Sequence, residues 1–516
     1  MGWLRGALIS LVPIALFAAS FLHFSDTAKP PQAEPSGSAM SFEEVASVGN
    51  HSVPITVYRP LSATADHRVP VILHSHGWAG KRETDPAAFA KYTNASFGVI
   101  SIDMRGHGEA RLTSEARVDH VDYEIQDVRN VITYASGLPW VQLDAPGDPR
   151  IGAIGGSYGG GYQLLTAALD SRLDAIVPEI TWNDLPQALV PNGAPKSAWV
   201  DLLYGGGKAN ARLHPTIDQA FAYLQVANKI PDGSVPGTPD IESQFIQSSP
   251  KTYPGKIAVP TLLVQGMPDT LFNFNQAAAN YELVKATGAP VSLVTHLRGH
   301  ILNTQGTIPI PAPTPIGLQP PTGRTPCGTY ESLAIAWFQH YLQRKGGAPK
   351  PEVCLAIDDG TSISGPSFPL PATSARAYDF AAGSILAQGA AAPNVTFNVL
   401  TVDQESVIAG IPKLKGTAQS AAPDAIVYWK LVVKDTLGHE RIADSQVTPW
   451  RLKGDPLATQ SFAFDLGGVA IRLRAGDTLQ LVASNADPQF AHNSEREPGA
   501  VILGAIHLEL PFANTA

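Results

Sequence analysis

The chain has 516 residues, a net charge of −9 and a hydrophobic fraction of 44%. This length exceeds one ordinary core, and the composition is that of a globular protein, so we expect at least two folded domains. The acidic charge and the lack of a long basic run argue against a nucleic-acid-binding protein.

The N-terminal segment predicts export. In residues 1–28 a basic residue, Arg5, precedes a long apolar run, which is the layout of a secretory signal peptide. A retained membrane anchor is the alternative, because the run approaches spanning length and no A-x-A site closes it. Residues 29–45 are rich in proline and small polar residues and predict a flexible tether. We expect a secreted, periplasmic or cell-surface protein whose membrane contact, if it is anchored, is made by this segment alone.

Strand and helix patterns alternate from about residue 68 to 345. Near-continuous apolar runs, each ending in glycine or a polar residue, cover 69–77, 97–106, 150–157, 173–180, 260–266 and 291–299. Such runs are typical of strands covered by helices on both faces. Helical patterns at 121–135, 274–288 and 330–347 supply those helices. Residues 46–345 therefore predict an α/β domain with a doubly wound, mostly parallel sheet.

Two segments depart from this alternation. Residues from about 182 to 253 carry proline, glycine and aromatic residues with two weak helical patterns, and they predict an inserted helical cap over the strand ends. Residues 353–516 read as short strands separated by turn residues. We expect an all-β domain there, either a β-sandwich or a jelly roll.

Cys327 and Cys354 are the chain's two cysteines. In an oxidising compartment they are expected to form a disulfide, whereas two buried free thiols would fit a reducing one. The two cysteines flank the last helix of the α/β domain and the start of the β domain. A bond between them is therefore expected to tie the two domains together.

A serine motif lies at the end of the third of these apolar runs. Gly155-Gly156-Ser157-Tyr158-Gly159 fits G-x-S-x-G, with a predicted strand before it and a predicted helix after it. In a nucleophile elbow the serine occupies a strained turn, and small neighbours prevent clashes. A glycine-rich turn without catalytic function is the alternative. The strand–turn–helix context favours Ser157 as a nucleophile.

An acid and a base follow in the order that this fold uses. Asp269 comes after the strand at 260–266, and His300 after the next strand, so both lie at carboxyl strand ends, where doubly wound sheets keep their sites. The alternatives are a helix N-cap for Asp269 and a solvated loop histidine for His300. His296 is a competing base, although it lies inside the predicted strand.

The oxyanion donors are predicted to be two backbone amides. His76-Gly77-Trp78 follows the first apolar run as in lipases and esterases, so the N–H of Trp78 is expected to act together with that of Tyr158. The Trp78 ring is also expected to pack against its neighbours. His107, in "DMRGHGEA", is expected in a structural turn without a catalytic role.

Four stretches carry a family resemblance: "SIDMRGHGEA", "GGSYGGGYQ", "VPTLLVQGMPDT" and the C-terminal "LRAGDTLQLVASNADPQF". With them the chain resembles the α/β-hydrolases of the cocaine-esterase and X-Pro dipeptidyl-peptidase (CocE/NonD) group over nearly everything after the tether. The resemblance implies a hydrolase core, a helical cap and a jelly roll, a Ser157–Asp269–His300 triad, and no metal or cofactor. The group often uses a tyrosine hydroxyl in the oxyanion hole, whereas this chain has "HGWAG" there.

The expected function is that of an exported serine hydrolase acting on a small ester or peptide substrate through an acyl-enzyme. An X-Pro dipeptidyl-peptidase and a non-catalytic binding protein are the alternatives. An X-Pro exopeptidase must pair a buried α-ammonium with a carboxylate. Carboxylates in the cap are Asp184, Asp201, Asp218, Asp232, Asp240 and Glu242, and none lies in a motif that directs it to Ser157. The aromatic residues of the cap predict an apolar pocket for the acyl group, which favours an esterase.

The β domain is expected to be structural and to help wall the active site. Its histidines, His439, His492 and His507, lack the spacing of metal ligands. The polar stretch "SNADPQFAHN" is expected to reach the cleft.

Overall fold

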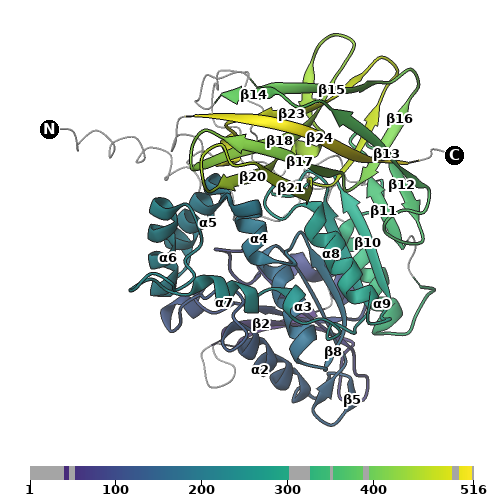
Figure 1. Ribbon diagram of the computed structural model, residues 1–516. Coiled ribbons are helices and arrows are strands. Elements are labelled where there is room, and N and C mark those ends of the chain that lie inside the picture. Colours follow the sequence, from purple (N-terminus) through teal and green to yellow (C-terminus); the bar gives the residue numbers. More distant parts are fainter. Residues whose placement is uncertain are drawn as a thin grey trace.

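The computed structural model describes residues 40–45, 53–300, 326–348, 352–387, 394–490 and 499–513. The predicted signal or anchor segment, residues 1–28, and His492 lie outside these residues. A layered α/β part and an all-β part pack against each other (Figure 1). Among the described helices, none is long and apolar enough to cross a membrane.

A ten-stranded sheet forms the α/β part, in the order β1-β2-β4-β3-β7-β8-β9-β10-β11-β12. The strands are β1 (Met40–Val45), β2 (Ile55–Pro60), β3 (Val71–Ser75), β4 (Gly98–Ile102), β7 (Ile151–Gly156), β8 (Leu173–Glu179), β9 (Thr261–Gly266), β10 (Val291–His296), β11 (Val353–Ala356) and β12 (Ser362–Gly365). The strands from β4 to β11 pair in parallel, and the outer strands β1, β2 and β12 pair antiparallel. The six apolar runs form β3, β4, β7, β8, β9 and β10, which confirms the predicted α/β fold.

Helices cover both faces of this sheet. Successive strand residues point to opposite faces, so Leu73 packs in the cluster of α2 (Glu124–Ser136) and α3 (Tyr158–Leu169), and Ile72 in that of α9 (Tyr330–Tyr341). This two-sided burial explains why the strands read as continuous apolar runs.

A helical insertion separates β8 from β9. It contains α4 (Leu185–Leu189), α5 (Ser197–Asn210), α6 (Pro215–Ala227) and α7 (Ile241–Gln247). The two weak helical patterns of the sequence fall in α5 and α6. α5 contacts the short helix η7 (Pro488–Phe490) of the β domain. The stretch "SNADPQF" therefore reaches the insertion.

The all-β part consists of two facing sheets. One has the order β21-β17-β24-β16-β22, with β13 and β14 added on β24, and the other has the order β15-β23-β18-β19, with β20 added on β18. The strands are β13 (Thr373–Phe380), β14 (Ser384–Ala387), β15 (Val395–Thr401), β16 (Ser406–Gly410), β17 (Lys413–Ser420), β18 (Asp424–Lys434), β19 (Glu440–Ile442), β20 (Thr448–Lys453), β21 (Gln460–Asp465), β22 (Val469–Leu473), β23 (Thr478–Ser484) and β24 (Ala500–Ala513). Residues of both sheets, such as Trp429 and Leu508, share one core. The predicted all-β domain is confirmed.

Both predicted domain boundaries differ from the structure. Met40–Val45, placed in the tether, forms edge strand β1, paired with β2. Val353–Ala356, placed in the β domain, forms β11 beside β10 in the large sheet. The partner of a short strand is not encoded in its own residues, whether the strand is apolar like β11 or of mixed polarity like β1.

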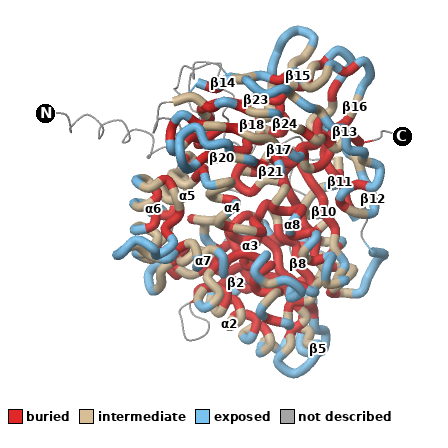
Figure 2. The backbone as a smooth tube through the Cα atoms, viewed as in Figure 1, coloured by how far each residue is buried: buried red, intermediate tan, exposed pale blue. Residues whose placement is uncertain are grey.

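The two parts meet across an apolar interface. Phe274 and Tyr281 of α8 (Phe274–Lys285) share a buried cluster with Val407 of β16 and Ala470 of β22. Figure 2 shows buried residues on both sides of the junction, in the large sheet and in the β domain. The β domain is therefore packed on the α/β part by contacts like those of a protein core.

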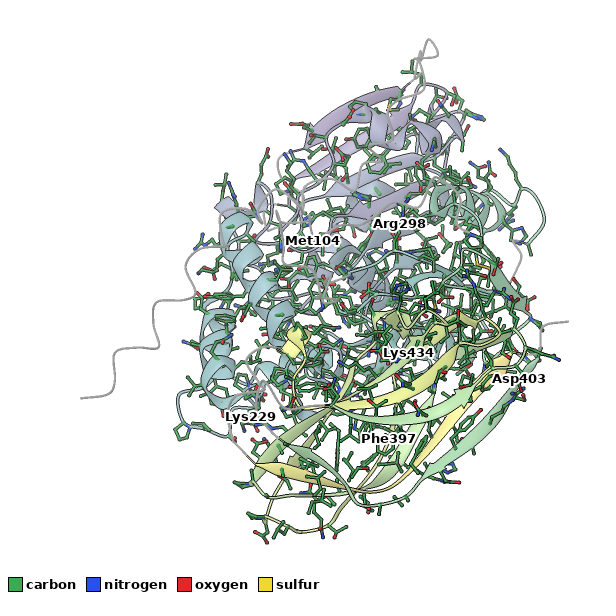
Figure 3. All side chains as sticks on the ribbon, turned by 90° about the horizontal axis from the view of Figure 1, so that it is seen from above. Met104, Lys229, Arg298, Phe397, Asp403 and Lys434 are labelled. Atoms are coloured by element: carbon green, nitrogen blue, oxygen red, sulfur yellow. A yellow bond between two sulfur atoms is a disulfide. The ribbon has the colours of Figure 1, made fainter. Side chains whose placement is uncertain are left out.

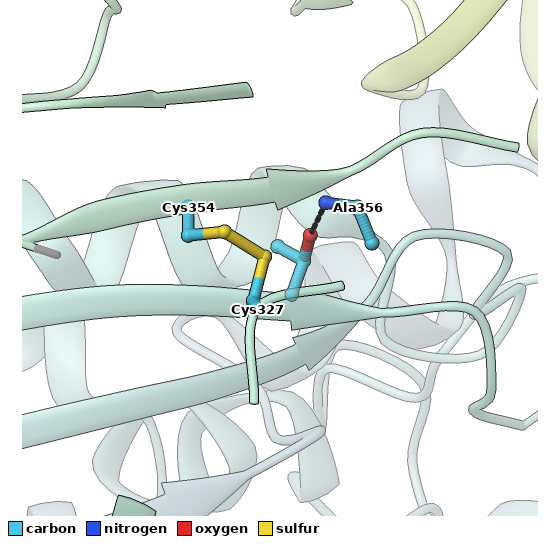
Figure 4. The surroundings of a disulfide bond; sticks show 4 residues. Cys327, Cys354 and Ala356 are labelled. Atoms are coloured by element: carbon cyan, nitrogen blue, oxygen red, sulfur yellow. Dashed lines mark hydrogen bonds between the residues drawn. A yellow bond between two sulfur atoms is a disulfide. The ribbon is translucent and has the colours of Figure 1, made fainter. Parts of the chain in front are cut away.

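Cys327 and Cys354 form a disulfide, as expected. Figure 4 shows it beside Ala356, whose N–H donates to Thr295 Oγ1 at 2.7 Å. Cys327 precedes α9 and Cys354 lies in β11, so both belong to the α/β domain. The prediction that the bond ties the two domains together is wrong, because β11 is a strand of the large sheet.

Candidate active site

Ser157 occupies a strained turn between β7 and α3. Its φ of 58° and ψ of −120° lie outside the backbone conformations that residues other than glycine favour. The turn is held from both sides: the N–H of Ser157 donates to the carbonyl of Glu179 at 2.9 Å, and the N–H of Gly160 donates to the carbonyl of Ser157 at 2.8 Å. Ser157 lies at the end of β7, where an elbow presents its nucleophile, and the residue is 7% exposed.

The glycines after Ser157 are required by close backbone contacts. A Cβ on Gly159 would lie 2.4 Å from the carbonyl oxygen of Ser75, and one on Gly160 would lie 2.7 Å from Cβ of Thr181. Both distances are far below van der Waals contact. Any side chain at either position would therefore push the helix away from the sheet.

Asp269 lies in the loop after β9 and is fully buried. Its Oδ1 accepts hydrogen bonds from the N–H groups of Leu271 and Phe272, at 3.0 and 2.7 Å. Its Oδ2 accepts from the N–H and Nδ1 of His300, at 2.9 and 2.7 Å. Because the N-cap of α8 is Asn273, Asp269 is not the cap of that helix. The structure brings Asp269 and His300 together.

Asp269 and two aromatic rings orient the imidazole of His300. The bond from Nδ1–H to Asp269 leaves Nε2 as the unprotonated nitrogen of the neutral ring. The rings of Trp199 and Phe272 contact the imidazole edge-on. Among the described residues, Ser157 Oγ makes no hydrogen bond to His300, and such catalytic contacts are often long before substrate binds.

The helical insertion clamps the loop that carries Asp269. Nζ of Lys196 donates to the carbonyl of Leu271 at 2.7 Å, and Nε1 of Trp199 donates to Oγ1 of Thr270 at 3.0 Å. The Thr270 N–H in turn donates to the carbonyl of His300 at 2.8 Å. Burial lowers the pKa of Lys196 to about 8, and Asp269 opposes part of that effect.

The predicted oxyanion loop lies beside Ser157. A Cβ on Gly77 would be 4.0 Å from that of Ser157. His76 fixes the loop: its Nδ1–H donates to the Gly77 carbonyl at 2.8 Å, and its Nε2 accepts from the Met104 N–H at 3.1 Å. In the part of the chain that is described, no protein acceptor takes the N–H of Trp78 or of Tyr158. The Trp78 indole also packs, donating to the carbonyl of Leu203 at 2.8 Å.

His296 and His107, the other histidines considered in the sequence analysis, make different contacts. His296 Nε2 lies 3.2 Å from Oε1 of Glu179, and its Nδ1 accepts from the Arg298 N–H at 3.1 Å. Neither ring nitrogen is directed to Asp269. His107 packs against the rings of Trp78 and Tyr158, and burial lowers its pKa to about 3.

Two further side chains near Asp269 escaped the sequence analysis. They are Lys196 of the insertion and Gln446 of the β domain, whose Nε2 donates to the carbonyl of Asp269 at 3.0 Å. Neither lies in a motif, and each reaches its partner across a large sequence separation. Figure 3 shows the side chains of both parts, with Met104 and Arg298 labelled on the α/β part and Phe397 and Lys434 on the β domain. Within the described ranges, no group of three or more His, Cys, Asp or Glu residues could hold a metal ion.

The doubly wound sheet with a strained serine turn after a central strand is the architecture of an α/β-hydrolase. Residues 49–302 match the X-Pro dipeptidyl-peptidase (S15) family. This match identifies the α/β part of the chain as a hydrolase of the X-Pro dipeptidyl-peptidase-like family.

Several solved structures share this fold. A CocE/NonD family hydrolase from Staphylococcus aureus superposes with a TM-score of 0.64 at 15% identity, covering 92% of this chain and 94% of that chain. An α-amino acid ester hydrolase gives 0.60 at 13% identity, covering 95% and 99%. An aminopeptidase from a Thaumarchaeota archaeon gives 0.59 at 13% identity, covering 95% and 100%.

Among curated proteins, the quorum-quenching protein AidA of Acinetobacter baumannii (strain MDR-ZJ06) is 30% identical over 130 residues, which are 25% of this chain. The match spans 40% of the length of that relative.

Proposed function

We propose that the protein is an exported serine hydrolase that cleaves acyl esters through an acyl-enzyme on Ser157, with Asp269 as the acid and His300 as the base. The observation that carries this proposal is the His300–Asp269 pair, 2.7 Å apart, in the loops that follow the neighbouring strands β9 and β10. Ser157 follows β7 at the same edge of the sheet, since the carboxyl ends of parallel strands meet there.

In the proposed reaction, Nε2 of His300 takes the proton of Ser157 Oγ as the oxygen attacks the ester carbonyl. The N–H groups of Trp78 and Tyr158 donate to the oxyanion that forms. His300 then gives its proton to the leaving alcohol. In the second half, His300 deprotonates a water molecule, which attacks the acyl-enzyme, and His300 then returns that proton to Oγ of Ser157 as the acid product leaves.

The insertion supports ester over X-Pro peptide hydrolysis. Five of its six carboxylates have partners of their own: Asp184 pairs with Lys251, Asp218 with Tyr204 and Lys208, and Asp232 with Lys229, while Asp201 accepts from Gln225 and Asp240 caps α7. An α-ammonium would have to displace one of these partners or bind Glu242. X-Pro peptide hydrolysis stays the second candidate, favoured by the match to that family.

Export is part of this proposal and is supported by the disulfide, which persists in oxidising compartments. We also propose that the strands of the β domain are connected as in a jelly roll.

Two experiments test the proposal. Ser157→Ala should fold normally and lose both hydrolysis and labelling by a fluorophosphonate, keeping at most a residual rate of about 10³–10⁴ over water. Full activity in this variant would exclude Ser157 as the nucleophile. Measuring kcat/KM for p-nitrophenyl butyrate and for Ala-Pro p-nitroanilide then separates the two candidates. Faster turnover of the anilide would make the protein a peptidase.

A further inference from the structure

The β domain reaches into the loop of the proposed catalytic acid through one side chain. We propose that Gln446 is a positioning residue that keeps Asp269 at hydrogen-bonding distance from His300. The β domain then contributes to the geometry of the catalytic centre. This inference rests on the proposed function, because it assigns Gln446 a role in the reaction of Ser157, Asp269 and His300.

Gln446 lies between the turn Ala443–Ser445 and β20, and its side chain is buried. Its Nε2 donates to the carbonyl of Asp269 at 3.0 Å, to that of Met267 at 3.1 Å and to that of Asp444 at 3.0 Å. Its two amide hydrogens are thus shared by three acceptors. Two of these carbonyls bracket the turn from which the Asp269 carboxylate projects.

The Asp269 carboxylate cannot shift to compensate for a movement of its own backbone. Its two oxygens already accept four hydrogen bonds, two from the turn Leu271–Phe272 and two from His300. A movement of the Asp269 backbone therefore changes its bond to Nδ1 of His300 directly. Gln446 acts on that backbone, not on the carboxylate itself.

The turn that presents Gln446 is itself strained. Asp444 and Ser445 have φ values of 44° and 57°, the left-handed region that residues other than glycine rarely adopt. Oδ2 of Asp444 accepts from the Ala470 N–H at 2.6 Å, and a Cβ on Gly467 would lie 2.7 Å from Cβ of Gln446. Strain of this kind persists only where the surroundings enforce it, and it clusters at functional sites.

The test compares Gln446→Met, which removes the donor and keeps the volume, with Asn275→Leu. Asn275 also joins the two parts, through bonds with Leu466 and Gly468 at 2.9 and 2.7 Å, and neither bond involves Asp269 or Met267. We expect Gln446→Met to lower kcat by about 10²-fold with little change in KM, since small misplacements of catalytic groups have effects of this size. Asn275→Leu should lower the Tm and leave kcat unchanged.

A second readout does not depend on substrate. The proton on Nδ1 of His300 should give a low-field NMR signal in the wild-type protein, which shifts or broadens in Gln446→Met and is unchanged in Asn275→Leu. An unchanged signal in Gln446→Met, or an equal fall in kcat in both variants, overturns the inference.

A wild-type protein that neither hydrolyses esters or anilides nor reacts with a fluorophosphonate defeats the proposed function instead, and the NMR comparison still decides the role of Gln446. If Gln446→Met does not fold, Gln446→Leu, which also lacks the donor, is judged by the same measurements.

Discussion

His300 binds one carboxylate oxygen of Asp269 twice, through its backbone N–H and through Nδ1. The backbone bond fixes where the residue lies, and the ring bond fixes which nitrogen carries the proton. The orientation of the imidazole and its tautomer are therefore set by the same atom.

Asp269→Asn should remove both of these hydrogen bonds at once, because the new NH2 group takes the place of Oδ2. The asparagine oxygen can still accept from Leu271 and Phe272, so the fold is retained, but its NH2 faces Nδ1 of His300 and imposes the wrong tautomer. We expect kcat to fall by about 10⁴-fold, as for this exchange in other Ser-His-Asp enzymes. Steady-state kinetics together with circular dichroism check this. A fall of less than tenfold would exclude Asp269 as the acid.

Gly159→Ala should be severely destabilising, because the new methyl group would lie 2.4 Å from the Ser75 carbonyl. We expect a loss of about 3 kcal/mol or no folded protein, since overpacking against backbone is not relieved by a rotamer change. Urea unfolding measures it. Gly205→Ala is the matched control: it lies within α5 with no atom near the new Cβ, and it should stabilise by about 1 kcal/mol. Equal effects of the two substitutions would contradict the close contact.

Asp444→Asn should remove a pH dependence of stability. Burial, reinforced by Asp358, raises the pKa of Asp444 from 3.8 to about 7, against the lowering effect of the Ala470 N–H and Arg441. Between these two pH values the folded protein binds more protons than the unfolded chain, so its unfolding free energy falls as pH rises from about 4 to about 7.

The variant lacks this group, so its unfolding free energy relative to the wild type should rise over the same pH range and level off above it. Glu124, whose pKa burial also raises to about 7, is present in both proteins and cancels in the difference. Urea unfolding at a series of pH values gives that difference. A difference that does not change with pH would show that Asp444 is ionised throughout.

Breaking the disulfide should destabilise the α/β domain. Cys327 and Cys354 are 27 residues apart, and closing a loop of this size contributes about 3 kcal/mol in the chain-entropy model. The double variant Cys327→Ser, Cys354→Ser should unfold at correspondingly lower urea concentration. Intact mass after alkylation under denaturing conditions, with and without reduction, checks the bond. Alkylation of both thiols without reduction would show that it does not form.

The sequence allowed prediction of those features that are encoded locally. The apolar runs, the Ser157 turn, and the positions of Asp269 and His300 after successive strands follow from periodicity and from the order of the chain. The pairing of β11 with β10 could not be predicted, because strand partners are not written in a four-residue strand. Lys196 and Gln446 could not be found either, since each is an isolated residue whose partner lies far away in the sequence.

The position of β11 and β12 also constrains how the protein is made. The sheet that carries Ser157, Asp269 and His300 includes strands that end at Gly365, well beyond α9. During synthesis the chain emerges from its N-terminus, so this sheet lacks an edge while all its proposed catalytic residues are already outside the ribosome. The strand β10 is then an open template for pairing with other chains. We therefore expect the amount of aggregated protein to depend on how fast the chain is translated after residue 300. Substitutions in the β domain, after Gly365, should change that amount less.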